Sequence, residues 1–185
     1  MHRSMKEDKK TYGSTHERLT SEGYAPEQTL QVRAKISVSE NGKRYLLATG
    51  GKEESVVYAV DGNIVTEGQR CDKLVLVKRS KKEVMPEQWT ESFVELKGVD
   101  TNHAINQLRQ TLKKAIFKHP SNDDVRARIV AQSFPSNKSN PAMEKAKQEF
   151  RKDYNCDLRG MKTGQEDKLS HSKGPLCKIE RTFCY

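Results

Sequence analysis

Two acidic residues and one lysine stand at spacings that suit metal-assisted chemistry. Asp72 directly precedes the apolar run "KLVLV", and Glu95 and Lys97 are separated by one residue in the run "FVELKG". If this second run is a strand, side chains two residues apart point to the same face, so Glu95 and Lys97 lie side by side. We expect the opposite face, which carries Val94 and Leu96, to face the core.

If the strands that follow Asp72 and contain Glu95 are neighbours, the charged groups converge at one end of a sheet. Two carboxylates and a backbone carbonyl, that of Leu96, are hard oxygen ligands that suit Mg²⁺, which keeps several waters for exchange with a substrate phosphate. Lys97 would orient or help deprotonate an attacking water and offset negative charge in the transition state. The chemistry indicated is hydrolysis of a phosphodiester.

The same residues also have a purely structural interpretation. Glu95 and Lys97 would then form an ion pair on a solvent-exposed strand, which stabilises a protein by well under ~1 kcal/mol. Asp72 would be no more than a turn residue. The spacing of these three residues does not by itself separate the two interpretations.

Period-two apolar patterns predict the strands that position these groups. Alternation from Leu30 to Val38, an Asn-Gly pair and a second apolar run predict a β-hairpin. The runs "SVVYAV", "NIVTEG" and "DKLVLV" are further predicted strands, with an Asp-Gly turn after the first. Trp89, in a polar connection, is expected to pack in the core or anchor a loop.

After Gly98 the apolar period lengthens to that of a helix. The pattern predicts a helix over residues 102–117 with Asp100 or Thr101 as its N-cap, a strand over "VRARIVAQSF", and a second helix that begins at Pro141. No clear helix precedes the first strands. The order of elements predicts a mixed α/β (α+β) fold with a central mixed β-sheet flanked by helices.

Length and composition predict one domain with loose ends. We expect residues 1–23 to be a disordered basic segment, residues 24–160 a single domain, and residues 161–185 a C-terminal extension. The four cysteines show no paired spacing and are expected to be reduced, with Cys71 buried. A zinc site would need an irregular set that matches no common finger: Cys156, His171, Cys177 and Cys184.

The chain carries 34 Lys and Arg against 25 Asp and Glu, a net charge of +9 that favours polyanionic partners such as nucleic acid. The first residues lack an apolar leader, and no apolar run is long enough to span a bilayer, so we expect a cytoplasmic protein without membrane contact. Basic residues beyond the first predicted helix are candidates to follow a phosphate backbone, or else form a solvated face: Lys113, Lys114, Lys118, Arg126 and Arg128.

The chain resembles the PD-(D/E)xK nuclease superfamily, in which an Asp precedes a strand, the next strand carries an acid-x-Lys triplet, and a helix follows. Asp72 matches the first acid, and Glu95, Leu96 and Lys97 match the triplet. Cys71 stands where the superfamily usually has Pro. The order of elements over roughly residues 30 to 135 is similar to that of small bacterial and phage-type proteins of this superfamily.

The resemblance implies a restriction-endonuclease-like fold and a Mg²⁺-dependent nuclease, with Mn²⁺ as a substitute. It implies that Asp72, Glu95 and the Leu96 carbonyl hold the metal and that Lys97 positions the attacking water. Members often present a polar residue from the following helix, which makes Gln107 the auxiliary candidate, whereas His103 is expected on a solvated face. A further acid is common, and four residues qualify without one standing out: Glu27, Glu53, Glu54 and Glu67.

DNA is the expected substrate ahead of RNA, because a role in defence against foreign DNA is common in the superfamily. An enzyme with one active site per chain needs two chains to cut both strands of a duplex, which suggests a homodimer. The alternative is a non-catalytic nucleic-acid-binding or assembly subunit that retains the nuclease fold. An RNA-cleaving enzyme would share the chemistry but not the substrate, and no readout helix or stacking motif separates the two polymers.

Overall fold

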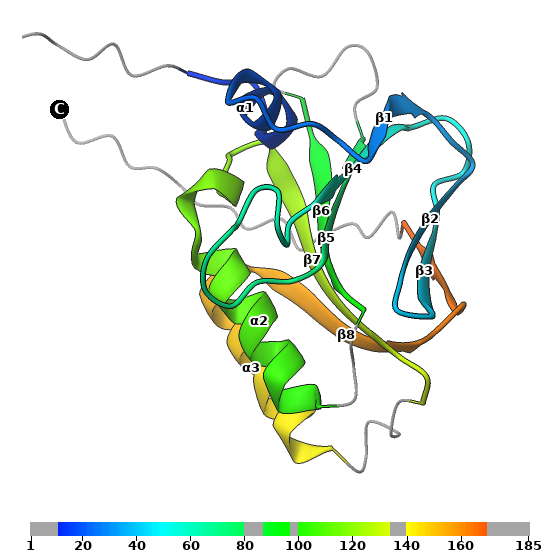
Figure 1. Cartoon of the computed structure of the whole chain (residues 1–185), viewed down its shortest axis with the longest axis vertical. Helices are drawn as coiled ribbons and strands as arrows, with labels where there is room; N and C mark the ends of the chain where they lie inside the picture. Colours follow the sequence, from blue (N-terminus) through cyan, green and yellow to red (C-terminus); the bar gives the residue numbers. More distant parts are fainter. Residues whose placement is uncertain (1–10, 80–86, 97–99, 134–139, 170–185) are drawn as a thin grey trace, which may run out of the picture.

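The computed structural model describes residues 11–79, 87–96, 100–133 and 140–169, and in this part of the chain two β-sheets form the framework (Figure 1). The larger sheet has six strands in the order β1-β4-β5-β6-β7-β8, and the smaller has three in the order β2-β3-β9. The predicted mixed α/β fold is confirmed. The larger sheet comprises β1 (Gln28–Val32), β4 (Glu54–Ala59), β5 (Lys73–Lys78), β6 (Trp89–Glu95), β7 (Asn122–Ala131) and β8 (Cys156–Lys162). The remaining elements are β2 (Lys35–Glu40), β3 (Lys43–Ala48), β9 (Glu166–Lys168), α1 (Thr15–Ser21), α2 (Thr101–Lys113), the 3₁₀ turn η1 (Ala115–Phe117) and α3 (Pro141–Tyr154).

Strand direction in the large sheet changes at β6. Strands β1, β4, β5 and β6 pair antiparallel in that order, whereas β7 is parallel to β6 and β8 is parallel to β7. Helices α2 and α3 make the two crossovers and lie side by side on one face of the sheet (Figure 1). The carboxyl ends of β6, β7 and β8 and the start of β5 therefore share one end of the sheet, which we call the site end. Helix α2 runs back over the sheet, and Thr111 in its last turn accepts a hydrogen bond from the Cys71 N–H, just before β5.

The strands β5 and β6 are buried on both faces. One apolar core lies between the large sheet and the helices and contains Leu74 and Phe93. A second core lies between the two sheets and contains Val75 and Val94. The expected burial of the Val94 face of β6 is confirmed, since the small sheet covers it. The face that carries Glu95 is buried as well, because the helices cover it.

The β2–β3 hairpin is confirmed, with Asn41 and Gly42 both at positive φ (49° and 73°), as a two-residue turn of this kind requires. The single strand expected from Leu30 to Val38 is in fact two strands that belong to different sheets, since β1 ends at Val32 and pairs with β4. The predicted strand "NIVTEG" is wrong: between β4 and β5 the chain forms a loop with one isolated bridge, Asp61 to Val65.

The helices largely follow their sequence signals. Asp100 caps α2 by accepting hydrogen bonds from the N–H groups of Asn102 and His103. The helix ends at Lys113, before the predicted end at residue 117, and the separate turn η1 begins at Ala115. Helix α3 begins at Pro141, as predicted. The polar strand β8 and the short strand β9 were not predicted. No helix among the described residues is long and apolar enough to cross a membrane.

Part of the N-terminal segment expected to be disordered is an ordered helix, α1. Ser14 caps it through a hydrogen bond from the N–H of Glu17, and Leu19 is fully buried against the large sheet. Arg18 donates to the carbonyl oxygen of Ala115 at 2.9 Å. The expectation of no early helix is also wrong; residues 1–10 lie outside the described part of the chain. Trp89 starts β6 with its ring packed near that of His16, which confirms core packing.

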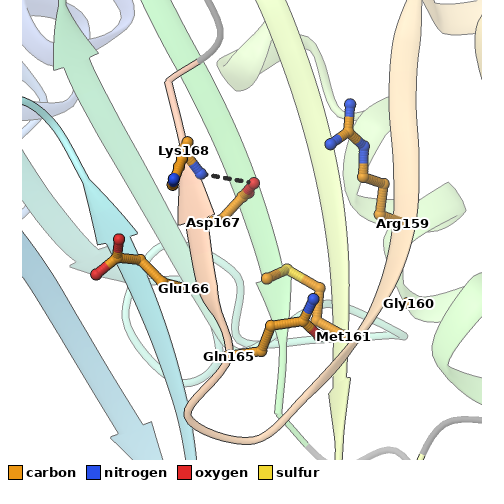
Figure 2. A pocket seen from close by; sticks show the side chains of 7 residues that line it. All are labelled: Arg159, Gly160, Met161, Gln165, Glu166, Asp167 and Lys168. Carbon is orange, nitrogen blue, oxygen red and sulfur yellow. Dashed lines mark hydrogen bonds between the residues drawn. The ribbon is translucent and has the colours of Figure 1, made fainter.

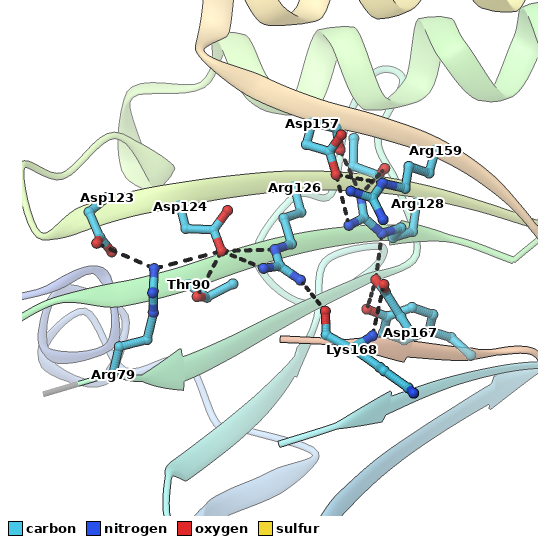
Figure 3. A network of polar contacts seen from close by, with 12 residues as sticks. Arg79, Thr90, Asp123, Asp124, Arg126, Arg128, Asp157, Arg159, Asp167 and Lys168 are labelled. Atoms are coloured by element: carbon cyan, nitrogen blue, oxygen red, sulfur yellow. Dashed lines mark hydrogen bonds and ion pairs between the residues drawn. The ribbon is translucent and has the colours of Figure 1, made fainter. Parts of the chain in front are cut away.

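Buried ion pairs hold the small sheet against the large one (Figure 3). Arg128 of β7 is fully buried; its Nε lies 2.5 Å from Asp167 Oδ2, and its NH1 donates to the Asp157 carbonyl at 2.6 Å. Tyr45 of β3 donates to the same Asp167 oxygen at 3.0 Å. Burial opposes ionisation of Asp167, but the Arg128 guanidinium holds the pKa of that carboxyl below its usual range. Residues 161–169, expected to lie in an extension, are thus part of the fold.

The predicted contacts of Arg126 and Arg128 with a phosphate backbone are wrong. Arg126 is almost fully buried, pairs with Asp124 at 2.6 Å and donates to the Lys168 carbonyl at 2.9 Å. Both guanidinium groups are buried and form their ion pairs and hydrogen bonds inside the protein. A charged residue on a strand points to the surface only if that face of the sheet is open, and here the small sheet covers it.

Replacing Asp167 by Ala should lower the free energy of unfolding by about 3 kcal/mol, because it removes the buried carboxylate beside the Arg128 guanidinium and leaves that group only the more exposed Asp157 carboxylate, at 3.1 Å. Urea denaturation measures the change. Lys147→Ala, which removes an ion pair with Glu144 on the surface of α3, is the control and should shift stability by less than about 1 kcal/mol. An Arg128→Met, Asp167→Leu double variant should recover most of the loss. An Asp167→Ala protein as stable as the control would contradict this account.

Candidate active site

The pairing of β5 with β6 brings Asp72 and Glu95 together at the site end. Lys73 lies opposite Val94 in this antiparallel pair, so the same register places Asp72 across from Glu95. The backbone of Asp72 is fixed on both sides: its N–H donates to the Val94 carbonyl at 3.1 Å, and its carbonyl accepts from the Val60 N–H at 2.9 Å. The sequence-based condition that the two strands be neighbours is met.

The Asp72 carboxylate is anchored to the strand that carries Glu95. Its Oδ2 accepts a hydrogen bond of 2.6 Å from the Leu96 N–H. Asp72 is 1% exposed, and Glu95 and Leu96 are fully buried. Burial raises the pKa of the Cys71 thiol, and the negative charges of Glu95 and Asp72 raise it further, so both acids lie within electrostatic reach of one sulfur.

Helix α2 holds the segment that leads into Asp72. The Cys71 N–H donates to Thr111 Oγ1 at 2.9 Å, and Gln107 Nε2 donates to the Arg70 carbonyl at 2.9 Å. Gln107 is buried, and its Oε1 has no hydrogen-bond partner in the described part of the chain. The structure thus places the predicted auxiliary residue against the segment that precedes Asp72, while His103 is exposed, as expected.

Lys97 lies outside the described residues, so the position of its ammonium group stays a prediction. For Glu95, however, the alternative of a surface ion pair is wrong, because this carboxylate is fully buried. Cys156 is buried in the core, and the other residues of the conceivable zinc set lie outside the described residues.

The donor set at the site end suits a hard cation. Within the described ranges, no cluster of three or more His, Cys, Asp or Glu side chains could hold a metal ion. A cation bound here would therefore have at most two side-chain ligands from these residues, Asp72 and Glu95. Two carboxylates and one carbonyl are a sufficient protein contribution for Mg²⁺, which retains several waters. Two buried acids on adjacent strands also require positive charge nearby if both are to be ionised.

The candidates for an additional acid lie away from this pair. Glu27 pairs with Lys73 at 2.6 Å, on the face of the sheet opposite the helices. Glu67 is exposed in the loop between β4 and β5, and Glu53 and Glu54 lie at the start of β4, at the other end of the sheet. None of the four converges with Asp72 and Glu95.

Sequence reasoning missed Glu91, which shares a face of β6 with Glu95. It is 2% exposed, and burial raises its pKa well above the usual value, an effect that a hydrogen bond with Asn122 only partly offsets. Glu91 Oε1 and Asn122 Oδ1 are both buried without a hydrogen-bond partner in the described structure. The i, i+4 spacing from Glu95 was the available signal. A protonated Glu91 that donates to Asn122 would satisfy both atoms.

The basic residues proposed for nucleic acid lie at and after the carboxyl end of α2. Lys113 and Lys118 are exposed and Lys114 is half-buried. This end of the helix is close to the start of β5, because Thr111 in its last turn accepts a hydrogen bond from the N–H of Cys71, the residue before Asp72.

A shallow pocket lies elsewhere, where β8 turns into β9 (Figure 2). It shares no residue with the candidate site. Cationic Arg159 and Lys168 are balanced in it by Glu166 and Asp167, so it has no net charge preference. Its lining is Arg159, Gly160, Met161, Gln165, Glu166, Asp167 and Lys168.

Comparison with known proteins adds no further assignment: no protein-family model, no curated protein and no solved structure matches the chain.

Glu91→Gln should stabilise the protein at neutral pH and not in acid. The native pKa is raised, so between the unfolded value near ~4.3 and the native value only the unfolded chain is ionised, and wild-type stability falls as pH rises. The variant has no carboxyl group to ionise, so at pH 7 its free energy of unfolding should exceed that of the wild type by on the order of 1–3 kcal/mol. This difference should vanish below about pH 4. Urea denaturation across pH 4–8 measures the gap. Glu67→Gln is the exposed control, and a gap for Glu91→Gln that does not change with pH would rule out a buried proton.

Proposed function

We propose that this protein is a Mg²⁺-dependent phosphodiester hydrolase of the PD-(D/E)xK superfamily, a nuclease that acts on DNA in preference to RNA. The observation that carries the proposal is the pairing of β5 with β6, which sets Asp72 across from Glu95. An acid before one strand, an acid-x-Lys triplet at the end of the next, then a helix and a parallel strand form the order that the resemblance implies.

Each residue has a distinct role in this proposal. Asp72 and Glu95 would hold the cation together with the Leu96 carbonyl, and the hydrogen bond from the Leu96 N–H already fixes the Asp72 carboxylate against that peptide. The bound cation would act as a Lewis acid and lower the pKa of a bound water. Lys97 would orient the attacking water, and Gln107 Oε1 would accept a hydrogen bond from water at the site.

The surroundings of the two acids favour an anionic substrate. Strands β6, β7 and β8 end at the site end. Binding sites of open α/β sheets lie beyond the carboxyl ends of parallel strands. Exposed Lys113 comes two residues after Thr111, whose hydroxyl accepts a hydrogen bond from the N–H of Cys71, next to Asp72. A cationic side chain near the acids would attract a phosphate group.

The complete burial of Glu95 favours a second candidate, a nucleic-acid-binding subunit that retains the fold without turnover. A hydrolase must let phosphate and water reach the carboxylates, whereas a binding subunit need not. The two functions differ in one measurable respect, metal-dependent cleavage.

The test is cleavage of labelled single-stranded DNA, duplex DNA and RNA with Mg²⁺, with Mn²⁺ and with EDTA. Wild type should cut at least one polymer only with metal, and Asp72→Asn, Glu95→Gln and Lys97→Ala should each slow cutting by more than about 100-fold. Glu166→Gln, an exposed acid of β9, is the matched control and should cut normally.

Calorimetry with Mn²⁺ separates loss of metal from loss of chemistry. The Asp72→Asn, Glu95→Gln double variant should lose the heat of metal binding, whereas Lys97→Ala should keep it. Metal-independent cutting, or full cutting by all three single variants, would refute the nuclease assignment. Salt-sensitive binding without cutting would establish the second candidate instead.

A further inference from the structure

Five cations gather where α2 and α3 end. Both helices cross from one parallel strand to the next, so they run in the same direction and finish at the same end of the sheet. Arg109 of α2 pairs with Glu149 of α3 at 2.8 Å and confirms that their last turns are adjacent. We call this surface the basic end: Lys113, Lys114, Lys118, Arg151 and Lys152.

The fold does not use these cations to complete its helix ends. Arg18 of α1 donates from NH1 to the carbonyl oxygens of Ala115, Ile116 and Lys118, so the carbonyls that follow α2 already have a donor. Helix α3 ends at Asn155 in the left-handed conformation (φ 49°), whose N–H donates to the Phe150 carbonyl. The cations of the basic end are therefore available to an external ligand.

The charge of the basic end exceeds what the helices require. Each helix carries about half a negative charge at its carboxyl end. Asp153 is the one acid among the described residues of these two last turns that is not paired with Arg109. No member of the basic end forms an ion pair with another described residue, and four of the five are exposed. Five cations against one acid and two half-charges leave a clear positive surplus.

We infer that the basic end is a docking surface for the phosphate backbone of a nucleic acid, bound without sequence readout. The inference takes from the proposed function only that the partner is a nucleic acid, and it requires neither metal nor turnover. The five cations are distributed over the carboxyl ends of two helices, so they can contact several phosphates at once. The surface thus suits a polymer and not a mononucleotide.

The composition of the surface argues against a lipid partner. Binding at a membrane surface combines cations with apolar side chains that enter the lipid. Within the described ranges the one large apolar side chain that is strongly exposed is Val32, on edge strand β1, away from the helices. Cations without apolar neighbours are typical of contacts with a phosphate backbone.

The experiment compares two variants of equal charge and equal composition in the full chain. One carries Lys113→Gln, Lys118→Gln and Arg151→Gln at the basic end. The control carries Lys43→Gln, Arg44→Gln and Lys52→Gln, on the β2–β3 hairpin and the loop after it, across the large sheet from the helices. Fluorescence anisotropy in EDTA measures binding to duplex DNA, single-stranded DNA and RNA from 50 to 200 mM salt, after circular dichroism confirms folding.

The basic-end variant should lose at least about tenfold in duplex affinity at the lowest salt, and the slope of log affinity against log salt should fall by about 2 to 3. The control should bind like wild type. If both variants lost the same affinity for duplex DNA, the effect would come from net charge alone. If neither lost affinity, the contact would lie elsewhere on the protein. Each outcome overturns the inference. Polyglutamate that competes as well as duplex would overturn it in favour of an acidic protein partner.

This test is independent of catalysis. A protein that binds through the basic end in EDTA and never cuts keeps the inference and loses the nuclease proposal. A protein that cuts with Mg²⁺ while the basic-end variant binds and cuts like wild type keeps the nuclease proposal and loses the inference.

Discussion

The constraint on which this structure depends is that β5, β6 and β7 are covered on both faces and yet carry charged groups. Such groups must be compensated inside the protein. Arg128 has Asp167, Arg126 has Asp124, and Lys73 has Glu27. Burial raises the pKa of Glu91 and so favours its neutral form, which needs no compensating cation. Compensation of this kind decides where the small sheet docks, because Asp167 and Tyr45, both from that sheet, meet at the Arg128 guanidinium.

The sequence predicted the turns, caps and helices that are determined by interactions between residues close together in the chain. The Asn41-Gly42 turn, the Asp100 cap and the apolar period of α2 each act within a few residues, and each was recovered. Strand β8 was missed because it alternates weakly and contains Gly160, and its strand conformation comes from pairing with β7. The split between β1 and β2 was missed because alternation continues through it, and only the presence of a second sheet shows that the chain changes partners.

The site was predictable to the extent that it follows from strand order. Asp72 and Glu95 meet because consecutive strands pair in antiparallel fashion, which sequence order alone suggests. The two arginines of β7 were misjudged because their period-two spacing is identical for an exposed face and for a face covered by another sheet. Glu91 was missed for the same reason: nothing in a single strand distinguishes a solvated acid from one under a helix layer.

The basic end attracts a polyanion against the field of its own helices. The backbone field at the carboxyl ends of α2 and α3 is negative, and Lys113 and Arg151 belong to a group of side chains that outweighs it. The same end of α2 holds the segment before Asp72, because Thr111 accepts a hydrogen bond from the Cys71 N–H. A chain that needs only stable helices would gain from one cation in each last turn, whereas a chain that binds a polyanion gains from a surplus of cations there.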